Sequence, residues 1–289
     1  MTGFPRIRRV VAVLACIAAF ALAIAGTQAQ AAQSSPYVAL GDSYSAASGV
    51  LPPDPAAPPQ CIRSILNYPH VIAGSTGAEL TDVTCGGAET KDFSSSQYEG
   101  VAPQLDAVTS SARLVTMTIG GNDSGVFINS VVDCGRLGLL SLGQGSPCKD
   151  QYGSSFEDTI RNTTYPALVN ALGAVRARAP HAKVAILGYP WILPPTGGCY
   201  PIMPVAQGDV PYLRGIQATL NDAIRRAAAV THVTYVDFST VSEGHDACQP
   251  VGVRWIEPVV TTTNPVVVHP NALGESQMAA QTIKVLRLR

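Results

Sequence analysis

Several features are missing from this chain of 289 residues, and each absence excludes a class of protein. No two cysteines form a C-x-x-C pair and none of the five histidines is placed to complete a metal site, so no metal is expected, and no motif implies an organic cofactor. The apolar run at residues 10–25 is shorter than the roughly 20 residues that span a membrane. The chain also has no linker and no internal repeat, which favours one domain.

The amino-terminal segment has the composition of an export signal. Three arginines within the first nine residues precede the apolar run, and small residues follow it up to Ala32. Because basic, apolar and small-residue regions in this order form a secretory signal peptide, we predict a signal over residues 1–32, with cleavage near Ala31 or Ala32. The mature protein, residues 33–289, would then be secreted.

Basic charge is scarce in the predicted mature chain. Of the 19 Lys and Arg, the three arginines of the signal would be lost, which leaves 16 against 20 Asp and Glu, a net charge of −4. Such a chain lacks the basic surface that nucleic acids bind, so no nucleic-acid partner is expected.

The cysteine count indicates disulfides. Of the seven cysteines, Cys16 lies in the signal, and an even number of six in an exported chain favours full pairing. Six cysteines allow 15 pairings. We favour couples of neighbours along the chain, each of which would stabilise the fold by about 2–4 kcal/mol. These couples are Cys61 with Cys85, Cys134 with Cys148, and Cys199 with Cys248.

Strand-like and helix-like segments alternate along the chain. This order predicts an α/β fold, a three-layer α/β/α sandwich with a central five-stranded parallel sheet. The predicted strands are residues 37–40, 79–84, 113–119, 183–187 and 233–238, and the predicted helices are 67–74, 101–108, 156–179, 212–229 and 272–288. The proline-rich segment 51–59, the glycine-rich segment 125–153 and residues 191–211 are predicted to be loops.

The first predicted strand ends in a turn that carries Ser43. The sequence there is YVALGDSYS, residues 37–45, in which an apolar run breaks at Gly41. Such a turn places a side chain at the carboxyl end of the sheet, where doubly wound folds bind their ligands. A serine in a turn is more often only a local hydrogen bonder, so the hypothesis needs support from the rest of the chain.

Three further turns supply that support. A glycine turn with Gly86 and Gly87 follows the second strand, Asn122 follows the third, and His269 precedes the last helix. Each of them could be an ordinary turn or helix cap. Because the carboxyl ends of parallel strands share one edge of the sheet, these turns can meet in space.

Together these residue types match the chemistry of acyl transfer. A serine hydroxyl must lose a proton to attack a carbonyl carbon, and a neutral imidazole is the usual acceptor near pH 7. The oxyanion that forms needs donors already aimed at it. The backbone N–H of Ser43, the backbone N–H of Gly87 and the side-chain amide of Asn122 could be these donors.

With these four turns the sequence resembles the GDSL or SGNH hydrolases, in particular the secreted actinobacterial lipases and esterases. The resemblance rests on GDSYS at 41–45, CGGA at 85–88, GGND at 120–123 and His269 followed by proline. It implies a flavodoxin-like fold with Ser43 as nucleophile, His269 as base, and Gly87 and Asn122 as oxyanion donors. Family members often have serine at the position of Gly86.

The chain departs from the family pattern at one position. The pattern has an aspartate three residues before the histidine, and Val266 stands there. We therefore predict a Ser-His dyad in which the backbone carbonyl of Val266 orients His269. The alternative is that a carboxylate from another part of the chain orients His269. The candidates nearest in sequence are Asp237, Glu243, Asp246 and Glu257.

The leading interpretation is a secreted serine esterase or lipase that cleaves carboxylic esters of lipids. Apolar residues in the predicted loops, such as Trp191 and Leu193, favour acyl chains over sugars. The alternatives are a carbohydrate O-deacetylase on the same fold and an extracellular binding protein without catalysis. A standard α/β-hydrolase is disfavoured because Gly41-x-Ser43-x-Ser45 lacks the last glycine of G-x-S-x-G. We expect a monomer that acts on a small or lipid ester, with transient contact to a lipid interface.

Overall fold

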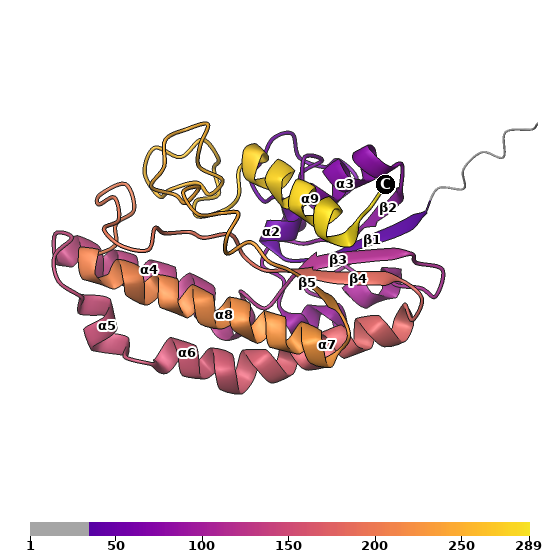
Figure 1. Cartoon of the computed structure of the whole chain (residues 1–289), viewed down its shortest axis with the longest axis horizontal. Helices are drawn as coiled ribbons and strands as arrows, with labels where there is room; N and C mark the ends of the chain where they lie inside the picture. The colour runs from indigo at the N-terminus through magenta and orange to yellow at the C-terminus, as the bar shows by residue number, and fades with distance from the viewer. Residues whose placement is uncertain (1–34) are drawn as a thin grey trace, which may run out of the picture. The chain divides into compact units, whose positions relative to one another are not determined.

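A parallel sheet of five strands in the order β2-β1-β3-β4-β5 forms the centre of the fold (Figure 1). The computed structural model describes residues 35–289, so the predicted signal peptide, residues 1–32, lies outside the described residues. The predicted strands are confirmed with shifts of a few residues at their ends. The strands are β1 (Pro36–Gly41), β2 (Glu79–Asp82), β3 (Leu114–Thr118), β4 (Lys183–Leu187) and β5 (Thr234–Val236).

The register aligns the carboxyl ends of the central strands. Val38 of β1 lies opposite Val115 of β3, which lies opposite Val184 of β4. All three side chains are buried, as expected of a parallel sheet that is covered on both faces. The turns that follow β1 and β3 therefore begin at the same edge of the sheet.

Two pairs of helices cover the two faces of the sheet (Figure 1). Helix α3 (Tyr68–Thr76) packs with α9 (Ala272–Leu286) on one face, and α7 (Tyr165–Arg178) packs with α8 (Val210–Val230) on the other. Buried side chains recur along α8 at intervals of three or four residues, which is the spacing of one helical face. The predicted three-layer α/β/α fold is thus confirmed.

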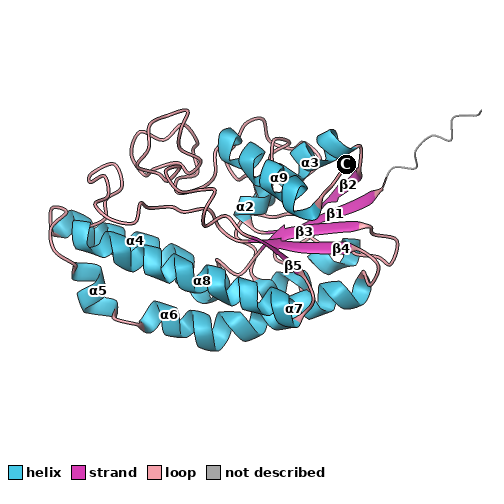
Figure 2. Cartoon of the chain, viewed as in Figure 1, coloured by secondary structure: helices cyan, strands magenta, loops and turns pink. Residues whose placement is uncertain are grey.

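Long loops leave the carboxyl ends of the strands (Figure 2). One follows β1, one connects β4 to α8, and one connects β5 to α9. The last of these ends at Asn271, whose side chain accepts a hydrogen bond from the N–H of Gly274 and caps α9. The cap fixes where the helix begins and so places His269 at the sheet edge.

The segment 125–153, predicted to be a loop, is instead mostly helical. It contains α4 (Val126–Leu140) and α5 (Pro147–Tyr152). The glycines in this segment had indicated a loop, but they allow close packing of a helix. A Cβ on Gly138 would lie 2.3 Å from the carbonyl oxygen of Pro204. Glycine therefore lets α4 approach the loop that follows β4.

Two predicted helices were also wrong in extent. Residues 101–108 form only the single 3₁₀ turn η3 (Gln104–Ala107), next to Pro103. The predicted helix at 156–179 is divided into α6 (Ser155–Thr159), the π-helical turn η5 (Ile160–Thr164) and α7. Pro166 near the start of α7 has no N–H for the regular ladder of hydrogen bonds, which explains the irregular turn before it.

Three disulfides pair the cysteines in the couples expected from the sequence. They join Cys61 to Cys85, Cys134 to Cys148, and Cys199 to Cys248. The second links α4 to α5, and the first fastens the loop after β1 to the turn after β2. Among residues 35–289, no helix is long and apolar enough to cross a membrane.

Candidate active site

Ser43 and His269 meet at the carboxyl edge of the sheet although 226 positions separate them in sequence. Ser43 is the first residue of the short helix α2 (Ser43–Ala46), directly after β1, and His269 lies just before α9. The Ser43 Oγ and the His269 Nε2 are 2.8 Å apart. This distance allows the hydroxyl to donate its hydrogen bond to the imidazole.

The turn that presents Ser43 depends on Gly41. Its φ is +123°, and a Cβ there would lie 2.3 Å from the carbonyl oxygen of Thr118. The side chain of Gln104 holds both backbone groups of Gly41, because its oxygen accepts from the N–H at 2.7 Å and its amide donates to the carbonyl at 3.1 Å. Only glycine fits this close approach of β1 and β3.

Asp42 stabilises the same turn through hydrogen bonds of its side chain. Its buried carboxylate caps α2 by accepting from the N–H of Tyr44, and it accepts from the hydroxyls of Thr118 at 2.6 Å and Tyr189 at 2.5 Å. Burial raises the pKa of Asp42 to about 6, although these hydrogen bonds oppose the increase. The Tyr189 hydroxyl also accepts from the N–H of Gly121, so Asp42 is connected to the loop after β3.

A backbone carbonyl orients His269, but it is not the one predicted from the sequence. The Nδ1 of His269 lies 2.8 Å from the carbonyl oxygen of Val267, so the prediction of Val266 was wrong. Val268 has a φ of +61°, and this left-handed residue turns the chain so that the carbonyl two residues before the histidine reaches the ring. The carbonyl of Val268 itself accepts from the Tyr44 hydroxyl at 2.8 Å.

The contact between the His269 Nδ1 and the Val267 carbonyl defines the protonation state of the imidazole. A carbonyl only accepts hydrogen bonds, so Nδ1 carries the proton and Nε2 is left to accept from Ser43. Burial lowers the pKa of His269 below its ordinary value of 6.5, although the bond to Val267 opposes the decrease. The ring is enclosed by Tyr44 at a centroid distance of 5.2 Å and Phe127 at 6.2 Å. The imidazole is therefore neutral and held in place at neutral pH.

Within residues 35–289, no carboxylate forms a hydrogen bond with the His269 side chain. Three of the four candidates from the sequence are engaged elsewhere. Asp237 accepts from Ser239, Glu243 pairs with Arg214, and Asp246 accepts from the N–H of Cys248. The fourth candidate, Glu257, has a structural role.

Glu257 supports the loop that carries His269. Its buried carboxylate pairs with Arg254 at 2.7 Å and accepts from the N–H of Thr263 and the amide of Asn271. Burial would raise the pKa of Glu257, but these partners outweigh it and lower the pKa to about 2. Its backbone N–H also donates to the carbonyl of His269 at 2.9 Å. Sequence reasoning missed this role because the partners of Glu257 are brought together only by the folded loop.

The amide of Asn122 lies against the glycine turn after β2. Its Nδ2 donates to the carbonyl of Ala88 at 3.0 Å, which leaves one N–H of the amide for another acceptor. The N–H of Gly86 donates to the carbonyl of Cys61 at 2.8 Å. By contrast, the N–H groups of Gly87 and Ser43 have no hydrogen-bond partner in the described part of the chain. The free donor in this turn is therefore at Gly87 rather than Gly86.

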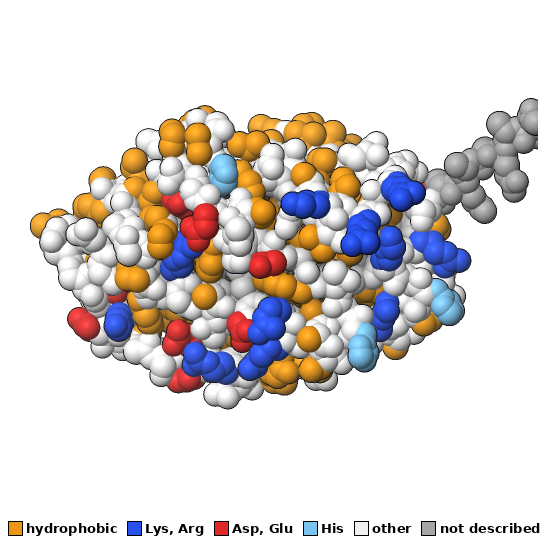
Figure 3. All heavy atoms as spheres, viewed as in Figure 1, with side chains coloured by type: hydrophobic (Ala, Val, Ile, Leu, Met, Phe, Trp, Pro, Cys, Tyr) orange, Lys and Arg blue, Asp and Glu red, His pale blue; other side chains and the backbone are white. Residues whose placement is uncertain are grey.

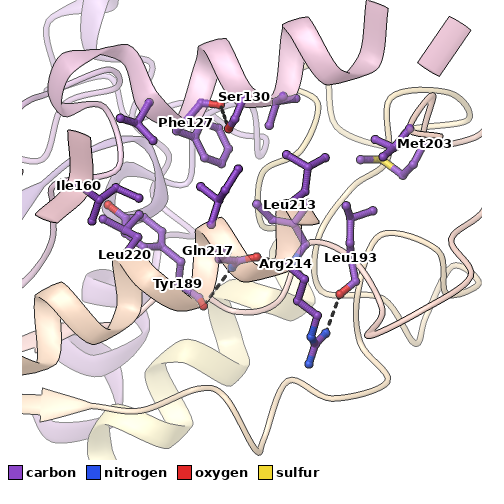
Figure 4. Close-up of a pocket in the computed structure, with 15 residues that line it drawn as sticks. Phe127, Ser130, Ile160, Tyr189, Leu193, Met203, Leu213, Arg214, Gln217 and Leu220 are labelled. Carbon is purple, nitrogen blue, oxygen red and sulfur yellow. Dashed lines mark hydrogen bonds between the residues drawn. The ribbon is translucent and has the colours of Figure 1, made fainter. Parts of the chain in front are cut away.

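A narrow apolar cavity lies beside the Ser43–His269 pair, between α4 and α8 (Figure 4). Its volume is about 50 Å³. Phe127, which contacts His269, and Tyr189, which binds Asp42, are both part of its wall. Figure 4 shows Phe127 of α4 directed toward Leu213 and Gln217 of α8. The remaining lining is mostly aliphatic, so the cavity suits a hydrocarbon group.

A serine hydroxyl bonded to an oriented imidazole, at the carboxyl edge of a doubly wound parallel sheet, is the arrangement that serine hydrolases use. The sequence profile of the GDSL-like lipase/acylhydrolase family matches residues 39–276. The chain belongs to this family, and it is a carboxylic ester hydrolase. Among residues 35–289, no cluster of His, Cys, Asp and Glu is arranged to hold a metal ion.

Known relatives support this assignment over nearly the whole chain. The sequence is 60% identical to Lipase 2 of Streptomyces coelicolor, over 98% of this chain and 99% of that protein. The extracellular lipase of Streptomyces rimosus has a similar structure, with a TM-score of 0.73 and 30% identity over 87% of this chain and all of that one. Phospholipase A1 of Streptomyces albidoflavus NA297 gives a TM-score of 0.72 and 29% identity over 87% and 99% of the two chains.

Proposed function

We propose that the protein hydrolyses carboxylic esters of lipids through an acyl intermediate on Ser43, with His269 as general base. The observation that carries this proposal is the 2.8 Å contact between the Ser43 Oγ and the His269 Nε2. It is supported by the bond from Nδ1 to the Val267 carbonyl, which leaves Nε2 as the proton acceptor.

In the first half of the reaction, His269 removes the proton of the Ser43 hydroxyl while the oxygen attacks the ester carbonyl carbon. The resulting oxyanion accepts hydrogen bonds from the N–H of Ser43, the N–H of Gly87 and the remaining N–H of the Asn122 amide. Collapse of the tetrahedral intermediate breaks the ester bond. The departing alcohol takes its proton from His269, and the acyl group stays on Ser43.

In the second half, a water molecule replaces the alcohol. His269 removes a proton from the water, the hydroxide attacks the acyl carbon, and the second tetrahedral intermediate uses the same donors. Its collapse releases the carboxylic acid and returns the proton to Ser43. The imidazolium that forms in each half is stabilised by the dipole of the Val267 carbonyl, so the catalytic unit is a dyad rather than a triad.

The apolar cavity supports an acyl substrate, because its wall offers few partners for the hydroxyls of a sugar. We place the mature enzyme, residues 33–289, outside the cell as a monomer that acts on a small or lipid ester. Export is supported by the predicted signal at 1–32 and by three disulfides, which persist in oxidising compartments. The structural relative from Streptomyces rimosus is described as extracellular.

The test uses 4-nitrophenyl esters with acyl chains of two to sixteen carbons. We expect hydrolysis of chains longer than acetyl, and we expect Ser43→Ala to abolish it because no other nucleophile lies against His269 in the described residues. Activity confined to acetyl esters would instead favour a carbohydrate O-deacetylase. Full activity of Ser43→Ala would refute the proposed mechanism.

A further inference from the structure

Exposed apolar side chains gather around the carboxyl end of the sheet. Within residues 35–289, every large hydrophobic side chain that is exposed to solvent lies on four segments, apart from Tyr98, Val230 and Val285. We call these segments the apolar rim. They are residues 51–66, 128–142, 200–202 and 251–267. Leu140 and Leu142 are among the most exposed, at 71% and 74%.

Three of the four segments of the apolar rim are in contact with one another. The N–H of Val260 donates to the carbonyl of Ile202 at 3.0 Å, which joins two of its segments. A Cβ on Gly143 would lie 2.8 Å from the ring of Tyr200, so the end of α4 packs against the same region. Apolar surface that is contiguous over several segments marks an interaction site, whereas single exposed hydrophobic residues do not.

One face of α4 contributes to this surface along most of its length. Ile128, Val132 and Leu139 are spaced four and seven residues apart, which places them on the same side of the helix. The close approach of Gly138 to Pro204 shows that α4 lies along the loop that includes segment 200–202. The exposed face of α4 therefore extends the surface formed by that loop.

The apolar rim carries almost no exposed charge. Two of its ion pairs, Arg63 with Asp54 and Arg254 with Glu257, have side chains that are less than a tenth exposed, and each pair is neutral. Figure 3 shows no charged side chain along the upper margin of this view, where hydrophobic atoms gather, whereas charged side chains lie over its lower and right parts and in one group left of centre. Asp133 and Arg136 of α4 have opposite signs. The surface thus offers nothing to a strongly charged partner.

The rim also borders the catalytic pair. Val267 orients His269 through its carbonyl while its own side chain is exposed on the rim. Phe127, the neighbour of Ile128, contacts the His269 ring. A second protein seated on this surface would cover the approach to Ser43, whereas a layer of ester substrate would be delivered to it.

We propose that the apolar rim docks the enzyme onto an uncharged lipid surface that contains its substrate. This inference rests on the proposed function, since it names the physical form in which the ester reaches Ser43. Exposed leucines and valines enter the lipid and stabilise the docked state by burial of apolar area. The rim lacks a basic cluster, so anionic lipids add no affinity.

The test is flotation with vesicles of diether phosphatidylcholine, which contain no carboxylic ester to hydrolyse. Wild-type protein is compared with the double variant Leu140→Ser, Leu142→Asn, in which asparagine tolerates the left-handed backbone of residue 142. Val230→Ser is the matched control, because this valine is 57% exposed at the end of α8, outside the rim. We expect the double variant to lose at least about tenfold in vesicle affinity and the control to stay within about twofold.

Hydrolysis of dissolved 4-nitrophenyl butyrate, at concentrations where the ester is monomeric, separates this inference from the proposed function. All three proteins should hydrolyse it equally, which also shows that the variants are folded. Absence of hydrolysis by the wild type would contradict the proposed function without involving the rim.

Three outcomes would overturn the docking proposal while hydrolysis persists. These outcomes are failure of the wild type to float with the vesicles, flotation of the double variant to the same extent as the wild type, and a requirement for anionic lipid. A wild-type dimer in sedimentation that the double variant abolishes would likewise reject it, because the rim would then be an interface between two copies.

Discussion

Replacing Glu257 with glutamine should weaken the fold far more than the chemistry. The carboxylate is buried and pairs with the equally buried Arg254 at 2.7 Å. Removal of one partner from a buried ion pair costs about 3–5 kcal/mol, because the remaining charge is left without compensation. Glutamine keeps one acceptor oxygen for the N–H of Thr263, so we expect the lower end, a loss of about 3 kcal/mol in the free energy of unfolding.

The pH dependence of this loss follows from the low pKa of Glu257. The partners of the carboxylate lower that pKa from 4.5 to about 2 in the folded state, so the ionised group contributes its stability in full above pH 4.5. The contribution is lost as the pH falls toward 2. The difference in unfolding free energy between wild type and Glu257→Gln should therefore shrink over this interval in urea unfolding curves, which tryptophan fluorescence can follow.

Catalysis by the folded variant should stay within roughly tenfold of the wild type, whereas loss of a true triad aspartate costs about 10⁴ in rate. The assay is kcat/KM for a dissolved ester, normalised to active sites by the initial burst of nitrophenol. Asp237→Asn, Glu243→Gln and Asp246→Asn are the matched comparisons, and none of them should lower the rate by more than roughly tenfold. A collapse of about 10⁴ at any of the four positions, in a protein that is still folded, would identify a third catalytic residue and refute the dyad.

Three further predictions concern the donors, the base and the disulfides. Asn122→Ala should lower kcat by about 10² to 10³ with little change in KM, since the amide acts on the oxyanion and not on the ground state; an unchanged kcat would remove it from the site. The acid limb of kcat/KM should have its midpoint below pH 6.5, because burial lowers the pKa of His269 and only the neutral imidazole accepts a proton; a midpoint above 7 would contradict this. Thiol titration of the denatured, unreduced mature protein should give a value near zero, and about two thiols per chain would mean that one disulfide is absent.

Features that depend on short stretches of sequence could be predicted. Short apolar or alternating segments predicted the strands, and the glycines that follow β1, β2 and β3 predicted the turns there. The meeting of Ser43 with His269 could be expected because parallel strands share one carboxyl edge. These inferences rely on local chain chemistry together with one topological rule.

Features that depend on tertiary contacts could not be predicted. The glycines of α4 indicated a loop, and only the packing of Gly138 against Pro204 explains why they lie in a helix. The carbonyl of Val267 replaces that of Val266 because Val268 adopts a positive φ, which a β-branched residue rarely does. The loop held by Glu257 supports that conformation, since Val268 donates its N–H to the carbonyl of Glu257 at 2.9 Å.

The central claim is that Ser43 carries the acyl group. The most direct measurement is mass spectrometry of the enzyme quenched during turnover of a 4-nitrophenyl ester, followed by proteolysis and peptide mapping. We expect one acyl group per chain on the peptide that contains Ser43, no adduct in Ser43→Ala, and much slower acylation in His269→Ala. An adduct on any other residue, or ester hydrolysis by Ser43→Ala at the wild-type rate, would contradict the mechanism.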